Sequence, residues 1–336
     1  MWILVALFAI VTGMWSYDVG IPLRDPHGTV FWSRIARSVV YFGLMALVDA
    51  GVRTGRRGWT VRKAVGVLRR RWTTRRLTLA MSGLLAYHVV YLCYHNLKSW
   101  DVFNQIRDGM LLGWDRWLFL GHSPAVLLHH LLGLHVAAYV LMVVYESFSR
   151  LVSLSFVAAL VFTTRIRDGY VFIASAMWAW ILGVGSYYLI PSLGPFSSAP
   201  REFAGLPHTM IQDTQAKYLA QRDYLLAHPH AGDAYAQISA FASLHVALTF
   251  VILLMARYYG LRRLGQALTV YLVAIIIATV YLGWHYAVDD IAGLVIGYLA
   301  VLLGRLMIYP PGTRGTQPTS ASTSDVKKPS PSVPGP

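Results

Sequence analysis

Long apolar stretches recur along the chain and are separated by short polar segments. Eight of them approach the length that a helix needs to cross the roughly 30 Å hydrocarbon core of a bilayer. They cover residues 2–16, 37–52, 77–96, 149–164, 170–191, 241–258, 266–284 and 286–306. The pattern therefore predicts an all-α, polytopic membrane protein with about eight transmembrane helices.

Two apolar segments need a separate interpretation. The first stretch, 2–16, lacks the basic start and the small-residue cleavage site of a secretory signal, so we expect an uncleaved first helix. Residues 124–148 are also long enough to be a span, but a crossing there would break the alternation of basic loops along the chain. We therefore predict an interfacial or re-entrant helix over 124–148.

Basic residues gather in a few of the polar connections. Ten Lys or Arg and no acidic residue lie between Arg53 and Arg76. Cytoplasmic loops of membrane proteins are enriched in Lys and Arg, so this loop is predicted to be cytoplasmic. Arg165 with Arg167, and the basic cluster at 257–263, should share that side. Eight crossings satisfy all three loops.

Composition excludes several classes of protein. Hydrophobic residues make up 56% of the chain and charged residues 13%, which excludes an ordinary soluble fold. The net charge of +14 is explained by membrane orientation and anionic lipid head groups, so we expect no nucleic-acid partner. Cys93 is the only cysteine, so an intramolecular disulfide is impossible and redox chemistry is not indicated.

Three ionisable residues are predicted to meet at the face opposite the basic loops. His245 lies near the outer start of the helix beginning at about 241, and His285 lies in the tight turn between the last two helices. His285 and Asp289 stand at i and i+4, so the carboxylate can accept a hydrogen bond from the imidazole. That bond fixes the tautomer and raises the basicity of the other ring nitrogen.

A histidine prepared in this way can attack an electrophile, while a second histidine gives a proton to the leaving group. Phosphorus is the natural electrophile, and the arrangement requires no metal. An isolated His-x-x-x-Asp on a helix is usually structural, so the interpretation depends on its context. Ser243 and His245 stand where a loop enters a helix, and the free backbone N–H groups there favour a phosphate.

Other polar residues receive a structural interpretation. His129, His130 and His135 suggest a metal site, but no carboxylate or cysteine joins them at ligand spacing, so we place them at the head-group boundary. Asp115 and Arg116 stand between tryptophans, as in an interfacial aromatic belt, and we expect them to be structural.

The sequence also resembles a known family. SLHVA at 243–247, followed by HYAVDDIAG at 285–293, resembles the type 2 phosphatidic acid phosphatase superfamily. WDRWLFLGHSP at 114–124 and YYLIPSLGPF at 187–196 are similar to landmarks of the branch that holds inositol phosphorylceramide synthase, an inositolphosphotransferase, and its bacterial relatives. The resemblance spans about 100–306 and implies a six-helix-type phosphatase or phosphotransferase core.

The resemblance also implies roles for individual residues. His285 would be the nucleophile, Asp289 its orienting carboxylate and His245 the general acid, while Ser243 would help to hold the phosphate. No cofactor or metal would take part. The sequence Ser243, Leu244, His245 fits the synthase branch, whereas the wider family has Pro-Ser-Gly-His.

Two cationic features of the wider family have no clear counterpart in this chain. The arginine six residues before the second histidine is replaced by Thr279, and the first motif, a lysine followed by Arg-Pro, has no clean match. Arg201, Lys217 and Arg222 in the predicted outer segment 192–240 are possible substitutes. The alternative is that all three are solvated loop charges.

These observations predict three regions and rank three functions. Residues 1–76 hold the N-terminal helices and the basic loop, 77–307 the catalytic membrane domain, and 308–336 a disordered cytoplasmic tail rich in Pro, Ser and Thr. The leading hypothesis is a phosphotransferase that moves a phosphate-bearing head group to or from a lipid on the periplasmic or luminal side. Hydrolysis of a lipid phosphate or polyprenyl diphosphate is the first alternative. A transporter or scaffold is the second, although the helix interiors are nearly free of charge.

Overall fold

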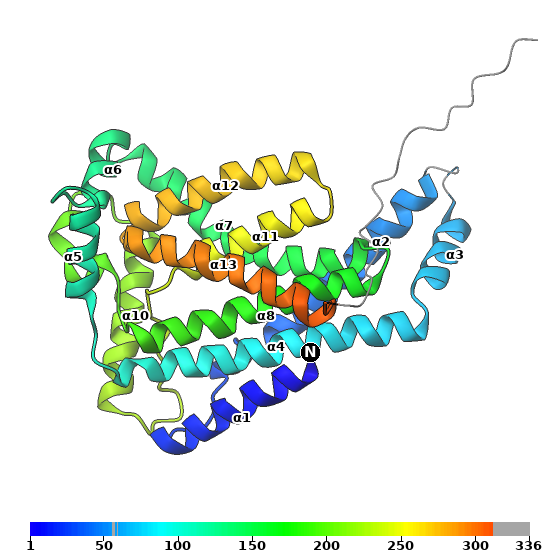
Figure 1. Cartoon of the computed structure of the whole chain (residues 1–336), viewed down its shortest axis with the longest axis horizontal. Helices are drawn as coiled ribbons and strands as arrows, with labels where there is room; N and C mark the ends of the chain where they lie inside the picture. Colours follow the sequence, from blue (N-terminus) through cyan, green and yellow to red (C-terminus); the bar gives the residue numbers. More distant parts are fainter. Residues whose placement is uncertain (56–57, 59, 312–336) are drawn as a thin grey trace, which may run out of the picture.

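The secondary structure of the protein is helical throughout the part of the chain described by the computed structural model, residues 1–55, 58 and 60–311 (Figure 1). Seven helices are long and apolar enough to cross a membrane, and α11 is a shorter apolar helix. The long ones are α1 (Trp2–Val19), α2 (Trp32–Gly55), α4 (Thr74–Trp100), α7 (Val136–Phe162), α8 (Ile166–Leu189), α12 (Arg262–Tyr281) and α13 (Ala287–Ile308). Together with α11 (Leu244–Tyr258) they confirm the predicted multi-pass helical fold.

Shorter helices fill the connections. They are α3 (Val61–Arg71), α5 (Asp108–Leu118), α6 (Pro124–Leu132), α9 (Pro195–Ser198) and α10 (Met210–Ala227), with 3₁₀ turns η1 (Pro26–Gly28), η2 (Asp101–Phe103) and η3 (Pro200–Phe203). Helices α5, α6 and α10 gather at one end of the bundle, and α3 lies at the other (Figure 1). The predicted tail begins where α13 ends, and its residues 312–336 lie outside the described part of the chain.

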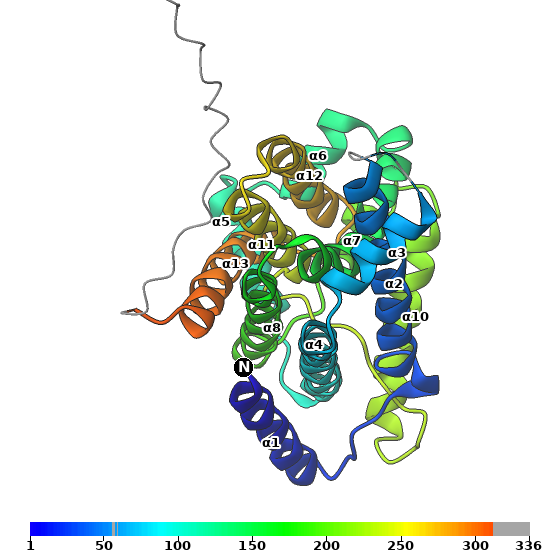
Figure 2. The same cartoon turned by 90° about the vertical axis from the view of Figure 1, so that its right-hand side faces the viewer.

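Helix α8 is the centre of the bundle. It packs against α4, α7, α11 and α13, whereas α1 lies outside on α4 and α2 outside on α7 (Figure 2). Small residues permit the closest contacts. A Cβ added at Gly304 of α13 would collide with Ser175 of α8, and one added at Gly297 would come within 2.7 Å of the Ala247 carbonyl of α11. Such small-residue contacts are a usual way for helices to associate in membranes.

The prediction for residues 124–148 was wrong. These residues form two elements: α6, and the beginning of the 27-residue helix α7. Gly133 separates them with a φ of 77°, a conformation that glycine adopts without strain. Helix α7 is therefore about 40 Å long, and the crossing predicted to begin at 149 begins at Val136. The alternation of basic loops is preserved because α7 crosses once and the short helix α6 does not cross. Helix α6 instead packs against the end of α12, where His129 Nε2 lies 2.9 Å from the Tyr281 carbonyl oxygen.

The three basic clusters lie at one end of the bundle, and side chains of two of them cap helices. Arg71 donates to the Val161 carbonyl oxygen at 2.6 Å, at the C-terminal end of α7. Arg167 donates to the Ile308 carbonyl oxygen, the last of α13. A cation is stabilised at a helix C-terminus because the unpaired carbonyls there carry partial negative charge. The basic loops therefore stabilise the same end of the fold that they mark in the sequence.

We predict that this basic end faces the cytoplasm. In a Cys93→Ser background, Gly232→Cys and Leu261→Cys place exposed thiols at opposite ends of the bundle. A membrane-impermeant maleimide should label Gly232→Cys in intact cells and should label Leu261→Cys only after permeabilisation. Labelling of both thiols in intact cells would contradict the eight-crossing topology.

Candidate active site

The two histidines are brought together by the contact between α11 and α13. Ser243 is the N-cap of α11, and its amide donates to the Asp289 carbonyl oxygen at 3.0 Å. Gly293 allows this approach, since an added Cβ would collide with the Ser243 carbonyl. His245 in the first turn of α11 therefore lies beside His285 in the α12–α13 turn, with 5.8 Å between the ring centroids.

His285 and Asp289 form the predicted i, i+4 pair. His285 Nδ1 lies 3.4 Å from Asp289 Oδ2, and both side chains are buried. The same carboxylate oxygen accepts the Tyr286 amide at 3.0 Å, at the start of α13. The imidazole–carboxylate distance is longer than a good hydrogen bond.

The protonation state of His285 suits a nucleophile. Burial lowers the pKa of its imidazole to about 4, the negative charge of Asp290 opposes this effect, and the positive charge of Lys98 adds to it. The ring is therefore neutral near pH 7, and one nitrogen keeps a lone pair. Nδ1 is the nitrogen nearest Asp289, so we assign the proton to Nδ1 and the lone pair to Nε2.

Aromatic side chains hold His245 in place. Its ring stacks on Tyr145 with 4.3 Å between centroids and also lies 4.3 Å from the ring of Phe148. The Trp284 ring in turn stacks nearly parallel to the Tyr145 ring. Tyr145 and Phe148 come from α7, in the part of that helix that the sequence interpretation had assigned to an interfacial segment. His245 is therefore in contact with two aromatic rings of α7 and also lies beside His285.

Both histidines line a cavity of about 390 Å³ that also contains cationic side chains. Of the three cations suggested by the sequence, Lys217 lines this cavity. Arg201 lies exposed on η3, and Arg222 pairs with Asp223 at 3.6 Å; neither lines the cavity. Ser243 is fully buried behind Leu244 and His245, so its contribution at the cavity is to begin α11 there.

Two further cations in the cavity escaped the sequence interpretation. Lys98, in the last turn of α4, has its ammonium 5.5 Å from the centre of the Tyr187 ring. Arg34, near the start of α2, reaches the same cavity. Within the described part of the chain neither has a carboxylate at ion-pair distance. The sequence shows that Lys98 ends an apolar helix. Only the fold brings it near residues that are about 150 to 190 positions later in the chain.

Helix α5 fixes the turn that carries His285. Asp115 accepts the Ala287 amide at 2.9 Å and the Val288 amide at 3.0 Å, so it caps the N-terminus of α13. Asp108 accepts the Gly194 amide at 2.8 Å and the Tyr286 hydroxyl at 2.9 Å. Burial raises the pKa of Asp115, and the two amide hydrogen bonds oppose that effect. The structural role expected for Asp115 therefore has specific partners, at the turn that holds the site.

Thr279, which stands where the wider family has an arginine, does not line the cavity. Thr279 is fully buried, and its hydroxyl donates to Asp290 Oδ2 at 2.9 Å. The bond ties the end of α12 to the first turn of α13. Among the residues that the structure describes, no group of three or more His, Cys, Asp or Glu side chains is arranged to hold a metal ion.

Comparison with known proteins gives one family. The family model described as "PAP2 superfamily" matches residues 109–303, which contain α5 to α12 and most of α13. No curated protein and no solved structure matches the chain. The matched segment includes His245, His285 and Asp289, and it begins after Lys98 and Arg34.

We predict that Asp115→Ala destabilises the α12–α13 turn. Loss of an N-terminal cap typically costs about 1 kcal/mol, so the melting temperature in detergent should fall by about 1–3 °C. His285 should become more reactive toward diethyl pyrocarbonate, which peptide mass spectrometry can quantify. Arg116→Ala is the matched control, because Arg116 lies half-exposed in a surface ion pair with Glu202. Equal protection of His285 in both variants would argue against a role of Asp115 in holding the α12–α13 turn.

Proposed function

This chain belongs to the PAP2 superfamily, and on that premise we propose that it is a phosphotransferase that moves a phosphate-bearing head group to or from a membrane lipid through a phosphohistidine at His285. Membership supports phosphatase or phosphotransferase chemistry on lipid phosphates. The observation that carries the proposal is the His285–Asp289 pair facing His245 in one cavity. We assign this chemistry to the domain 77–307.

The proposed reaction has two balanced steps. In the first, His285 Nε2 attacks phosphorus, the bond from phosphorus to the leaving oxygen breaks, and His245 gives that oxygen a proton. In the second, the hydroxyl of an acceptor attacks the phosphohistidine, His245 takes its proton, and His285 is restored. Asp289 stabilises the charge that His285 Nδ1 acquires while phosphorus is bound to Nε2.

Several groups of the site would stabilise the phosphoryl oxygens. The amides of the first turn of α11 lack hydrogen-bond partners within the helix, so they form an anion site at its N-terminus. Lys98 and Lys217 supply positive charge from two other elements, α4 and α10. These fixed donors replace the arginine and the first motif of the wider family. No step of this mechanism calls for a metal or another cofactor.

The cover over His245 favours an alcohol over water as acceptor. Tyr145, Phe148 and Trp284 exclude bulk solvent from one side of the proton donor. The Ser243-Leu244-His245 form of the motif, similar to that of the inositol phosphorylceramide synthase branch, points in the same direction. Hydrolysis of a lipid phosphate or polyprenyl diphosphate is the alternative, with water as acceptor in the second step.

The location of the site supports catalysis on the extracytoplasmic or luminal face. The cavity lies at the end of the bundle where α4 and α8 end and α11 and α13 begin, opposite the basic clusters (Figure 1). A lipid can enter this site from the bilayer with its phosphate near the head-group layer.

We predict that His285→Ala abolishes covalent labelling by a ³²P-labelled lipid and lowers turnover by more than a thousandfold. His245→Ala should lower the rate of phosphohistidine formation by about 10²–10⁴-fold, the usual contribution of a general acid. His130→Ala, in which an exposed histidine of α6 is removed, is the matched control and should retain activity. Purified protein in a chelating buffer should be tested by rapid quench with phospholipids and polyprenyl phosphates, with and without alcohol acceptors.

The products separate the candidate functions. Label transferred to an alcohol by the wild type alone supports the transferase, and free phosphate alone supports the phosphatase. Turnover that survives in His285→Ala would refute the nucleophile assignment. Absence of turnover with every substrate would leave a non-catalytic scaffold or transporter as the better explanation.

A further inference from the structure

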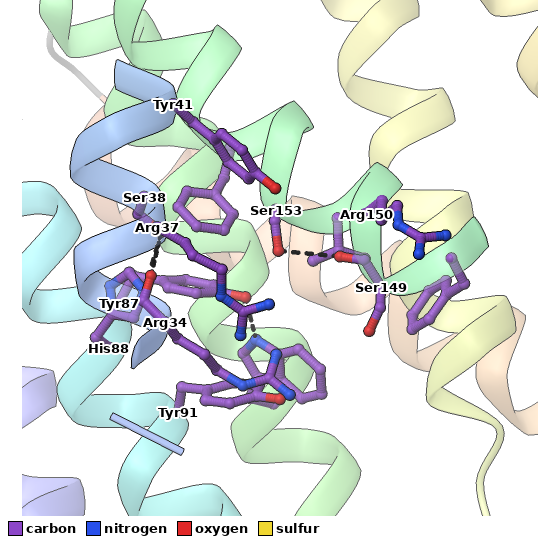
Figure 3. Close-up of a pocket in the computed structure, with 14 residues that line it drawn as sticks. Arg34, Arg37, Ser38, Tyr41, Tyr87, His88, Tyr91, Ser149, Arg150 and Ser153 are labelled. Carbon is purple, nitrogen blue, oxygen red and sulfur yellow. Dashed lines mark hydrogen bonds between the residues drawn. The ribbon is translucent and has the colours of Figure 1, made fainter. Parts of the chain in front are cut away.

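A second cavity, of about 110 Å³, lies between α2, α4, α7 and α8 and is lined by arginines (Figure 3). Arg34 and Arg37 extend into it from α2, and Arg150 lies at its α7 rim. Arg34 and Phe148 line both this arginine groove and the histidine cavity. The groove thus adjoins the candidate active site and shares part of its wall.

On α7, Glu146 lies one turn before Arg150, so the positive charge that the protein leaves unpaired is that of Arg34 and Arg37 in the groove. None of the described residues that line it is acidic, and Arg34 and Arg37 form no ion pair with any described residue. Arg34 Nε is buried without a hydrogen-bond partner, and its guanidinium lies 4.7 Å from the centre of the Tyr91 ring. Guanidinium groups can donate up to five hydrogen bonds, so most of this capacity is available to a ligand.

Arg34 is half-buried over the Tyr91 ring, whereas Arg37 and Arg150 are exposed. Tyr91 lies nine residues before the end of α4, about 14 Å along that helix. Arg150 lies near the middle of α7. Arginine at such a position in a membrane helix is costly and usually marks a functional site.

The groove adjoins the proton donor rather than the nucleophile. Phe148, which lines the groove, has its ring 4.3 Å from that of His245. The leaving oxygen must lie on the His245 side of the reacting phosphorus, so whatever is attached to that oxygen extends toward the groove. Exposed apolar side chains of α2 and α7, among them Val40, Leu44 and Val143, would let a lipid chain continue into the bilayer.

We propose that Arg34 and Arg37 form a second anion subsite, which holds a lipid-borne phosphate other than the one that His285 attacks. The inference rests on the proposed function. With a lipid diphosphate, His285 takes the terminal phosphoryl group, the bridging P–O bond breaks, and its electron pair stays on the oxygen of the departing lipid monophosphate, which His245 protonates. The guanidinium groups stabilise the charge that develops on that leaving group. A second anionic phospholipid bound beside the substrate offers the same chemistry.

The subsite is built partly from outside the matched family segment. Arg34 and Arg37 belong to α2, which precedes the segment 109–303 that matches the PAP2 superfamily, whereas Arg150 and Phe148 lie within it. Helix α2 therefore completes a wall beside the proposed reaction centre, which is built from helices of the matched segment. Substrate selection would reside in this added wall.

The test compares a lipid monophosphate with the corresponding diphosphate as substrates of full-length protein in neutral detergent micelles. Arg37→Gln should lower the diphosphate-to-monophosphate ratio of kcat/KM at least tenfold, and Arg37→Lys should recover part of the loss. Arg263→Gln, at the basic end of α12, is the control and should leave the ratio unchanged. A second arm adds phosphatidylglycerol to the monophosphate assay. A phosphatidylglycerol stimulation that Arg37→Gln removes would assign the subsite to a second lipid instead.

A binding measurement keeps this inference separate from the proposed function. The His285→Ala variant is subjected to gel filtration with radiolabelled lipid diphosphate or with radiolabelled phosphatidylglycerol. Addition of Arg37→Gln should decrease the retention of one of these two lipids at least tenfold. Failure of turnover with this binding difference intact would refute the function but not the subsite. The subsite is overturned if Arg37→Gln changes neither the substrate ratio, nor the stimulation, nor lipid retention.

Discussion

The close approach of α11 and α13 is the contact on which the candidate site depends. Gly293 and Gly297 present no side chain to α11, so the Ser243 amide reaches the Asp289 carbonyl oxygen. One backbone hydrogen bond thereby fixes the distance between the helix that carries His245 and the helix that carries Asp289. Wider spacing of these helices would separate the two imidazoles, whatever their sequence positions.

The remainder of the bundle supports this contact from two sides. On one side, α8 packs along α13, and the small residues Gly304 and Ser175 allow it to come close. On the other, α5 holds the start of α13 through Asp115. The carboxylate at the N-terminus of α13 and the arginine at its C-terminus are each favourable for the helix dipole. The helix is therefore fixed at both ends and along its length.

Local patterns in the sequence predicted the fold and the histidine pair, whereas the composition of the cavity depends on distant contacts. The apolar stretches predicted the eight helices, because a membrane crossing needs a long apolar helix. The i, i+4 spacing predicted that His285 would face Asp289, although His285 lies in the turn before α13 rather than on the helix. The boundary between α6 and α7 was missed because the apolar pattern continues across Gly133, where the backbone turns with a positive φ. Lys98 and Arg34 were missed because nothing near them in sequence indicates which residues α4 and α2 will face. The roles of all these residues in catalysis stay predictions.

The candidate site and the cations proposed to choose its substrate come from different parts of the chain. Both histidines and Asp289 lie on elements joined by short connections, so their geometry is set by adjacent helices of the matched segment. Lys98, Arg34 and Arg37 come from helices before that segment. Changes in those helices can alter charge around the cavity without moving the α11–α13 contact. A phosphoryl-transfer centre can therefore be retained while the lipid that it accepts changes, which is how one fold comes to serve different substrates.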